Sequence, residues 1–162
     1  DVTFFCGPAA EAVGAHKAVL VARSEYFHGM FRKGAMREGQ TSKVTVEGHE
    51  PSSMRKMLEF IYTNRVSDLG KSNAEELTRL LSLSEEYLLR DLKTLVEHAA
   101  RAAVDANNVA KLLDAAEQFH ADVLKQACMD YIHKNMADVS HNPNFEQHFC
   151  SAPALGIAII KA

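Results

Sequence analysis

The sequence predicts an α+β fold in which a small strand region precedes a mostly helical remainder. Residues 2–6 and 43–47 place β-branched and aromatic residues on alternating faces, as half-buried strands do. From Pro51 onward, apolar residues recur at intervals of three and four, the spacing of one face of a helix. Because strands come first and helices follow, the two kinds of element are segregated, which indicates α+β rather than an alternating α/β sheet.

The N-terminal elements are predicted to be short. The strand at 2–6 ends at the turn signal Gly7-Pro8, and residues 12–15 are its expected hairpin partner. A short apolar helix is predicted at 16–21. Ser24 is expected to cap the next helix, because a serine hydroxyl can accept a hydrogen bond from a free backbone amide at a helix start. The expected inward face of that helix comprises Phe27, Met30 and Phe31.

The next part of the chain is predicted as a loop, a strand and a helix. Residues 33–42 hold two glycines among polar residues without periodicity, which indicates a loop. Val44 and Val46 share one face of the following strand, and Gly48 ends it. Pro51 suits the first turn of a helix, where its missing amide hydrogen is not needed. The expected inward face of that helix comprises Met54, Met57, Leu58, Ile61 and Tyr62.

The rest of the chain is predicted as helices joined by short connectors. Ser72-Asn73-Ala74-Glu75 matches a capping box, in which hydroxyl and carboxylate each accept from the other residue's backbone amide. A second helix is expected after Tyr87, a third with Asp105 and Asn107 as candidate caps, and a fourth at 121–136. Shorter helical segments are expected at 143–150 and 154–161. The expected inward faces comprise Leu77, Leu80, Leu81 and Ser84; Leu88, Leu92, Leu95, Val96 and Ala99; Val109, Leu112, Leu113, Ala116 and Phe119; and Leu124, Cys128, Tyr131 and Ile132.

Composition and charge restrict the classes of function. The 162 residues are 47% hydrophobic and 24% charged, which is typical of a globular protein with its own core. A net charge of −3 with scattered lysines and arginines lacks the basic footprint of a nucleic-acid binder. No apolar run approaches the roughly 18 residues of a membrane-spanning helix. Three widely spaced cysteines do not resemble a disulfide scaffold, so we expect a cytoplasmic or nuclear protein with no nucleic-acid or membrane partner.

No constellation of residues predicts catalysis. The sequence lacks CxxC, HExxH, GxSxG and phosphate-loop motifs. The tightest cluster of candidate metal ligands, His141, His148 and Cys150, falls short of the four closely spaced ligands of structural zinc. Cys128 falls on an apolar helix face and is expected to be a small core residue. We therefore expect a protein that is not an enzyme and uses no cofactor or metal.

An ordered series of short segments runs through about the first hundred residues. The segments are Asp1-Val2-Thr3-Phe4-Phe5, Ala15-His16-Lys17-Ala18-Val19-Leu20, Ala22-Arg23-Ser24-Glu25-Tyr26-Phe27, Met30-Phe31, Met36-Arg37-Glu38, Val44-Thr45-Val46, Phe60-Ile61-Tyr62-Thr63, Leu80-Leu81, Tyr87-Leu88-Leu89 and Leu92. Their order and spacing resemble a BTB/POZ domain. The resemblance implies the BTB/POZ fold, a small three-stranded sheet flanked by helices, over residues 1–104.

A second series of segments follows in the C-terminal part. The segments are Asn108-Val109-Ala110, Ala115-Ala116, Leu124-Lys125-Gln126-Ala127-Cys128 and Tyr131-Ile132. They resemble the helices that follow BTB domains in ubiquitin-ligase adaptors, called the 3-box or the N-terminal part of a BACK domain. The resemblance implies helical hairpins of a partial BACK region over residues 105–162.

The combined resemblance implies a substrate adaptor for a cullin-3 RING ubiquitin ligase. In that family the BTB domain and 3-box hold the cullin, and a domain outside this sequence would hold the substrate protein. Met36-Arg37-Glu38 matches the family's hydrophobic-x-Glu motif, which implies that Met36 inserts into the cullin and that Glu38 orders the loop or pairs with the partner. Tyr62 lies at another family contact position.

The resemblance also implies a homodimer. Val19, Leu20 and Phe27 belong to segments that are core or dimer-facing in the family. The sequence begins after the helix that builds many family dimers, so a weaker dimer, or none, is expected. Two alternatives stay open. In the first, Met36 caps the core of its own domain and Glu38 is an ordinary loop charge. In the second, the chain is an oligomerisation, scaffold or corepressor-binding BTB domain that meets no cullin. The helix pair at 105–136 favours the adaptor.

Overall fold

The structure is a computed structural model that describes residues 1–32, 42–143, 145 and 147. Two compact units make up the chain. The sheet unit comprises Asp1–Leu69 and Ser82–Lys93, and the helical unit comprises Gly70–Leu81 and Thr94–Ala162. Helices α5 (Ala74–Glu86) and α6 (Arg90–Ala102) therefore contribute a segment to each unit. The predicted domain boundary after residue 104 rests on resemblance and stays a prediction.

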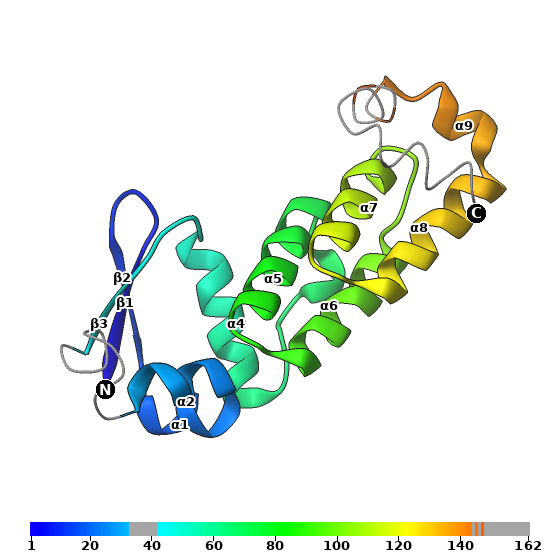
Figure 1. Cartoon of the computed structure of the whole chain (residues 1–162). Helices are drawn as coiled ribbons and strands as arrows, with labels where there is room; N and C mark the ends of the chain where they lie inside the picture. The colour runs from blue at the N-terminus through cyan, green and yellow to red at the C-terminus, as the bar shows by residue number, and fades with distance from the viewer. Residues whose placement is uncertain (33–41, 144, 146, 148–162) are drawn as a thin grey trace. The chain divides into compact units, whose positions relative to one another are not determined.

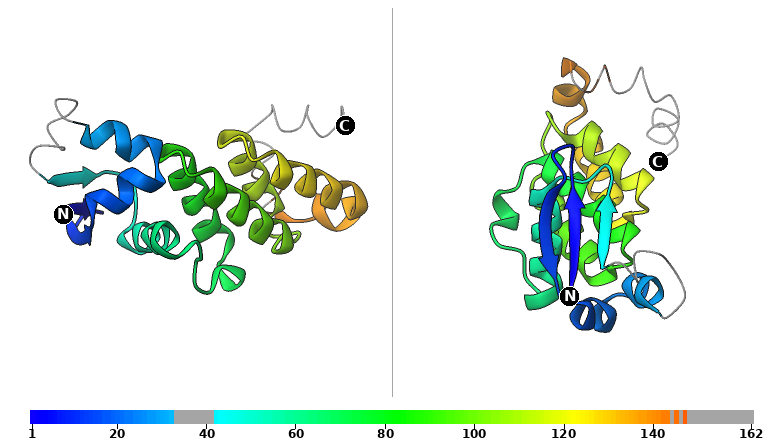
Figure 2. Two further views of the ribbon diagram at one scale, coloured as in Figure 1. Left: turned by 90° about the horizontal axis from the view of Figure 1, so that it is seen from below. Right: turned by 90° about the vertical axis from the view of Figure 1, so that its left-hand side faces the viewer.

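The sheet unit contains a three-stranded sheet, which confirms the predicted α+β class. Strand β1 (Val2–Cys6) lies between β2 (Glu11–Ala15) and β3 (Lys43–Val46), as the right-hand view of Figure 2 shows. It pairs antiparallel with β2 and parallel with β3. The parallel pair requires a crossover, which α1 (Lys17–Arg23) and α2 (Glu25–Phe31) supply. The inward residues of the strands are Val2, Phe4, Cys6, Val13, Ala15, Val44 and Val46.

Ser24 joins three helices of the sheet unit through one hydroxyl. Its Oγ accepts from the backbone N–H of Phe27 at 3.3 Å, which confirms the predicted cap of α2. The same hydroxyl donates to the carbonyl of Tyr87, at the end of α5, over 2.7 Å. Ser24 is also where α1 ends, because its backbone N–H bonds to the carbonyl of Leu20. A buried hydroxyl with both its donor and its acceptor satisfied fixes the α1–α2 corner.

Helix α4 (Pro51–Thr63) begins with the predicted proline and buries most of its predicted face. The exception is Tyr62, which is 45% exposed. Its expected place on the inward face is wrong, because Phe60 and Ile61 fill the core at this turn. Asn64 ends the helix in the left-handed conformation, with φ 59°, and its N–H bonds to the Phe60 carbonyl. Such a residue closes a helix by satisfying one of its last carbonyls.

The helical unit contains the predicted hairpin of α7 (Val109–Gln118) and α8 (Asp122–Lys134), which lie side by side in Figure 1. Helix α9 (Met136–Ser140) follows it as a separate short element, where the sequence predicted the end of α8. A one-turn 3₁₀ helix, η1, spans Leu69–Lys71. The segments predicted at 143–150 and 154–161 fall largely or wholly outside the described residues. The buried residues of α7 and α8 are Val109, Ala110, Leu112, Leu113, Ala115, Ala116, Leu124, Cys128, Met129 and Ile132.

The cap of α5 differs from the prediction. The amide oxygen of Asn73 accepts from the N–H of Glu76 at 2.9 Å, so Asn73 rather than Ser72 caps the helix. The Glu75 carboxylate instead pairs with Arg79 at 2.7 Å and Lys111 at 3.6 Å. An asparagine caps a helix as well as a serine does. A helix that begins one residue later than predicted therefore loses little stability. The Glu75 carboxylate is then available for these ion pairs.

The turn between α5 and α6 also corrects a prediction. Leu88 was expected inside, yet its side chain is 55% exposed and its φ is 53°. Leu89 is buried in its place, and α6 begins at Arg90. Two adjacent residues in a turn point in different directions, so only one leucine of the pair can enter the core.

Glu97 supplies the cap that the start of α8 lacks. The residue before α8 is Ala121, which has no side-chain acceptor. The Glu97 carboxylate, on α6, accepts from the backbone N–H groups of Val123 at 3.0 Å and Leu124 at 3.3 Å. Glu97 is buried, with 7% of its surface exposed. A carboxylate at a helix start satisfies free amides and interacts favourably with the helix dipole.

Candidate protein-interaction surface

The predicted contact motif Met36-Arg37-Glu38 lies outside the described residues. The structure does describe both ends of the segment that holds it. Phe31 is the last residue of α2, and Ser42 directly precedes β3. Both are half-buried in the sheet unit. The expected roles of Met36 and Glu38 stay predictions.

Tyr62, the remaining predicted cullin contact, is accessible and held in place. Its hydroxyl accepts from the backbone N–H of His16 at 2.9 Å and lies 2.7 Å from the Nδ1 atom of the same histidine. The two rings meet edge to face with centroids 5.9 Å apart. An aromatic residue that is exposed yet oriented loses little side-chain entropy on binding, which is the property of an interface anchor.

Tyr62 borders an open groove between α1 and the end of α4. The groove has a volume of about 460 Å³ and is lined by Ala18, Val19, Ala22, Arg23, Ile61, Tyr62, Thr63 and Asn64. The His16–Tyr62 contact lies toward the start of α1, and the Arg23 guanidinium donates to the Asn64 side-chain oxygen at the other end of that helix. Small and apolar side chains between two polar contacts have the arrangement of a protein interface, an apolar centre with a polar rim.

The three residues predicted for the dimer interface lie in different places. Leu20 and Phe27 are both 0% exposed, so their side chains offer no surface to a second copy. They belong to the core of the sheet unit because α1 and α2 turn those faces toward the sheet. Val19 is half-buried and lines the groove. Of the three, Val19 alone is available for the expected interface.

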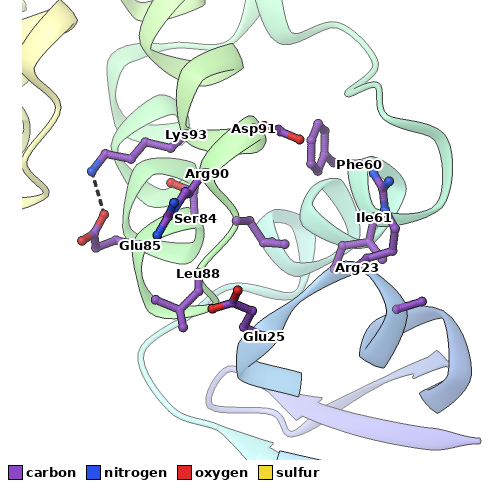
Figure 3. Close-up of a pocket in the computed structure, with 12 residues that line it drawn as sticks. Arg23, Glu25, Phe60, Ile61, Ser84, Glu85, Leu88, Arg90, Asp91 and Lys93 are labelled. Carbon is purple, nitrogen blue, oxygen red and sulfur yellow. Dashed lines mark hydrogen bonds and ion pairs between the residues drawn. The ribbon is translucent and has the colours of Figure 1, made fainter. Parts of the chain in front are cut away.

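A second, more polar hollow lies in the sheet unit beside the α5–α6 turn (Figure 3). Its volume is about 720 Å³, and it is lined by residues of α1, α2 and α4, the end of α5, the turn and the start of α6. Leu88 stands exposed at its edge, and Lys93 pairs with Glu85 at 2.7 Å. The charged lining residues are Arg23, Glu25, Glu85, Arg90, Asp91 and Lys93. Helical periodicity predicted Leu88 to be buried and so did not identify it as a surface residue. The adjacent pair Leu88-Leu89 after a helix is a signal that one of the two leucines is exposed.

Candidate metal ligands and cysteine thiols lie apart in the described part of the chain. It holds no cluster of three or more histidine, cysteine, aspartate or glutamate side chains suited to a metal ion. Burial raises the pKa of the Cys128 thiol to about 12 and is the main cause that raises the pKa of Cys6. Both thiols are therefore protonated at neutral pH and poor nucleophiles. Cys128, 0% exposed, is the core residue that the sequence predicted.

Membrane-spanning helices are absent from the described residues. None of the helices there combines the length and the hydropathy that crossing a bilayer requires. The longest helices of the sheet and helical units have 13 residues each. A span needs about 20 residues.

Two protein families and a nematode protein are similar to this chain. Residues 1–103 match the family described as BTB/POZ domain. Residues 108–159 match the family described as BPM/SPOP, BACK domain. The BTB and MATH domain-containing protein 40 of Caenorhabditis elegans is 28% identical over 165 aligned residues, which cover 99% of this chain. The aligned part is 40% of the length of that relative, so the chain spans about two fifths of it.

Proposed function

This chain belongs to the BTB/POZ family, and from that premise we propose that it is the interaction module of a substrate adaptor for a cullin-3 RING ubiquitin ligase. BTB and BACK domains are protein-interaction modules, and this chain carries both in that order. In the proposed role it catalyses nothing. It raises the local concentration of a substrate protein near the ligase, an effect that needs simultaneous binding rather than new chemistry.

The single observation that carries the proposal is the BACK match of the BPM/SPOP type directly after the BTB match. A BTB domain with this helical extension resembles those of ubiquitin-ligase adaptors, whereas a scaffold or corepressor-binding BTB does not need it. The printed name of the C. elegans relative also includes a MATH domain. We propose that a comparable domain, outside this sequence, binds the substrate. A cytoplasmic or nuclear location belongs to the same proposal.

Cullin binding is expected to depend on the motif in 33–41 and on Tyr62. The double variant Met36→Asp, Glu38→Arg and the single variant Tyr62→Ala are each expected to weaken binding to the N-terminal region of cullin-3 by about tenfold or more, because interface anchors carry most of the binding energy. Isothermal titration calorimetry on the full chain measures the dissociation constant. Tyr62→Phe keeps the aromatic ring, so it is expected to lose less affinity for cullin-3 than Tyr62→Ala.

The matched control is Ala12→Asp combined with Glu47→Arg, which makes the same two charge changes at exposed positions of the sheet unit. It should bind as the wild type does. Undiminished binding by the double variant would remove Met36 and Glu38 from the interface. A wild-type chain that does not bind the cullin fragment at all would favour the oligomerisation or corepressor alternative.

Self-association is expected to involve Val19, the one predicted dimer residue whose side chain is not fully buried. Val19→Asp places a charge among the alanines of the groove, and an unpaired charge opposes burial in an interface. The dimer dissociation constant is expected to rise by about tenfold or more, measured by size-exclusion chromatography with light scattering over a concentration series. Val123→Asp, at a valine in the helical unit that is 44% exposed, is the control. An unchanged dimer in Val19→Asp would assign the interface elsewhere.

A further inference from the structure

The hydroxyl of Tyr62 meets two nitrogen atoms of one residue, His16. It accepts from the His16 backbone N–H at 2.9 Å, and it lies 2.7 Å from the Nδ1 atom of the His16 ring. His16 is the residue directly before α1, so the hydroxyl from α4 supplies an acceptor for one of the free amides at the start of α1. Both groups are described and both lie in the sheet unit.

The two contacts with His16 leave one hydrogen-bonding position free on the Tyr62 hydroxyl. A hydroxyl donates one hydrogen and accepts through two lone pairs. The backbone N–H always donates, so it occupies one lone pair. The Nδ1 atom accepts the hydroxyl hydrogen when it carries no hydrogen itself, and it donates to the second lone pair when it carries one. The hydrogen on Nδ1 therefore determines whether the position that remains for a partner is an acceptor or a donor.

The surroundings of the His16 ring favour a neutral form with no hydrogen on Nδ1. The other ring nitrogen, Nε2, lies 4.0 Å from the Asp1 carboxylate, an acceptor that favours the hydrogen on Nε2. Among the described residues, Asp1 and Tyr62 are the titratable groups in contact with the ring, because the ammonium of neighbouring Lys17 bonds to Ser42. The His16 side chain is 66% exposed, so it exchanges protons freely with water. Histidines are mostly neutral at pH 7.5 and gain the second ring hydrogen as the solution becomes acidic.

We propose that His16 is a positioning residue for partner binding at Tyr62, because it sets the direction of the Tyr62 hydroxyl hydrogen. With neutral His16 the hydroxyl donates to Nδ1 and presents an acceptor to the partner. The partner group that fits is therefore a hydrogen-bond donor: an amide, an ammonium or a guanidinium. Protonation of His16 reverses the hydroxyl, so that two donors face each other and binding weakens.

The two parts of this proposal have different foundations. The role in partner binding rests on the proposed function, in which Tyr62 contacts cullin-3. The direction of the hydroxyl rests only on the contacts of Tyr62, His16 and Asp1. The two parts are therefore tested separately.

The first test locates the ring hydrogens without a partner. Two-dimensional ¹H–¹⁵N NMR of the full chain distinguishes a ring nitrogen that carries a hydrogen from one that does not, and at pH 8 the hydrogen is expected on Nε2 of His16. The ¹³Cζ resonance of Tyr62 is expected to titrate together with the His16 ring. It should show no such titration in His16→Asn, because an amide does not change charge. A hydrogen on Nδ1 at pH 8, or a Tyr62 resonance that does not follow His16, would overturn the proposal.

The second test measures affinity for the N-terminal region of cullin-3 by isothermal titration calorimetry at pH 7.5 and pH 5.5. The wild type is expected to bind about fivefold more weakly at pH 5.5, the loss that corresponds to one hydrogen bond. His16→Asn keeps an acceptor beside the hydroxyl, so at pH 7.5 it is expected to bind within about twofold of the wild type and to lack the fivefold loss at pH 5.5. His16→Ala is expected to bind about threefold more weakly at pH 7.5.

The matched control is His28→Ala, which removes an exposed histidine of α2 in the same unit. It should keep both the affinity and the pH dependence of the wild type. Titration of the cullin fragment itself is common to all variants, so the difference between variants is the result. If His16→Ala does not fold, the comparison of His16→Asn with the wild type decides.

The outcomes separate this proposal from the proposed function. The same pH dependence in the wild type, His16→Asn and Tyr62→Phe would exclude His16 from a role in binding. Tighter binding of the wild type alone at pH 5.5 would contradict the assignment of a donor to the partner. A wild type that does not bind the cullin fragment would overturn the proposed function and the binding role together. The NMR measurement would still support or overturn the effect of His16 on the hydroxyl.

Discussion

Phe27→Ala is expected to lower the free energy of unfolding by about 4 kcal/mol, the largest effect of any single substitution considered for this chain. The side chain is 0% exposed and lies at the centre of an aromatic cluster. Its ring stacks on Tyr87 at 5.0 Å and meets Phe4 edge to face at 5.8 Å between centroids. Removing it deletes these contacts and leaves a cavity that rigid neighbouring rings cannot fill. Chemical denaturation followed by circular dichroism measures the loss.

Leu88→Ala is the control for this prediction. It truncates an apolar side chain in the same unit that is 55% exposed, and the expected change is within about 0.5 kcal/mol. A Phe27→Ala variant that unfolds as the wild type does but no longer self-associates would return Phe27 to the dimer interface. The stability measurement therefore also decides where this residue acts.

Glu97→Ala is expected to lower the free energy of unfolding by about 3 kcal/mol, because it leaves two backbone amides at the start of α8 without an acceptor. The carboxylate on α6 accepts from Val123 and Leu124 in a buried setting, and the residue at the cap position, Ala121, cannot replace it. The loss is expected to appear as a lower midpoint of urea unfolding. Helical amides at the start of α8 should exchange faster with solvent than in the wild type.

Two further variants define what the Glu97 carboxylate contributes. Glu97→Gln keeps the shape and one oxygen acceptor, so it is expected to recover part of the lost stability. Glu75→Ala removes a glutamate of the helical unit whose ion pairs with Arg79 and Lys111 lie at the surface. It is expected to lower the free energy of unfolding by about 0.5 kcal/mol or less. If Glu97→Ala were as mild as Glu75→Ala, the Glu97 contacts with α8 would not be a significant source of stability.

The sequence alone determined the elements and the fold class. Alternation at Val44 and Val46 predicted β3, and the spacing from Met54 to Ile61 predicted the buried face of α4. Ser24 was predicted as a cap and is one. These predictions were possible because strand alternation, helix periodicity and caps are set by residues within a few positions of each other. The BTB/POZ resemblance was likewise carried by short segments in order, and the family match over 1–103 confirms it.

The tertiary structure decided which side chain of a local pair faces the core and which distant groups meet. It placed Leu89 inside and Leu88 outside, and it left Tyr62 at the surface beside His16. It joined Glu97 to the start of α8, 26 residues along the chain, and Lys17 to Ser42, 25 residues along. Local periodicity cannot predict these outcomes, because they depend on the space left by other elements and on backbone amides whose partners come from elsewhere in the chain.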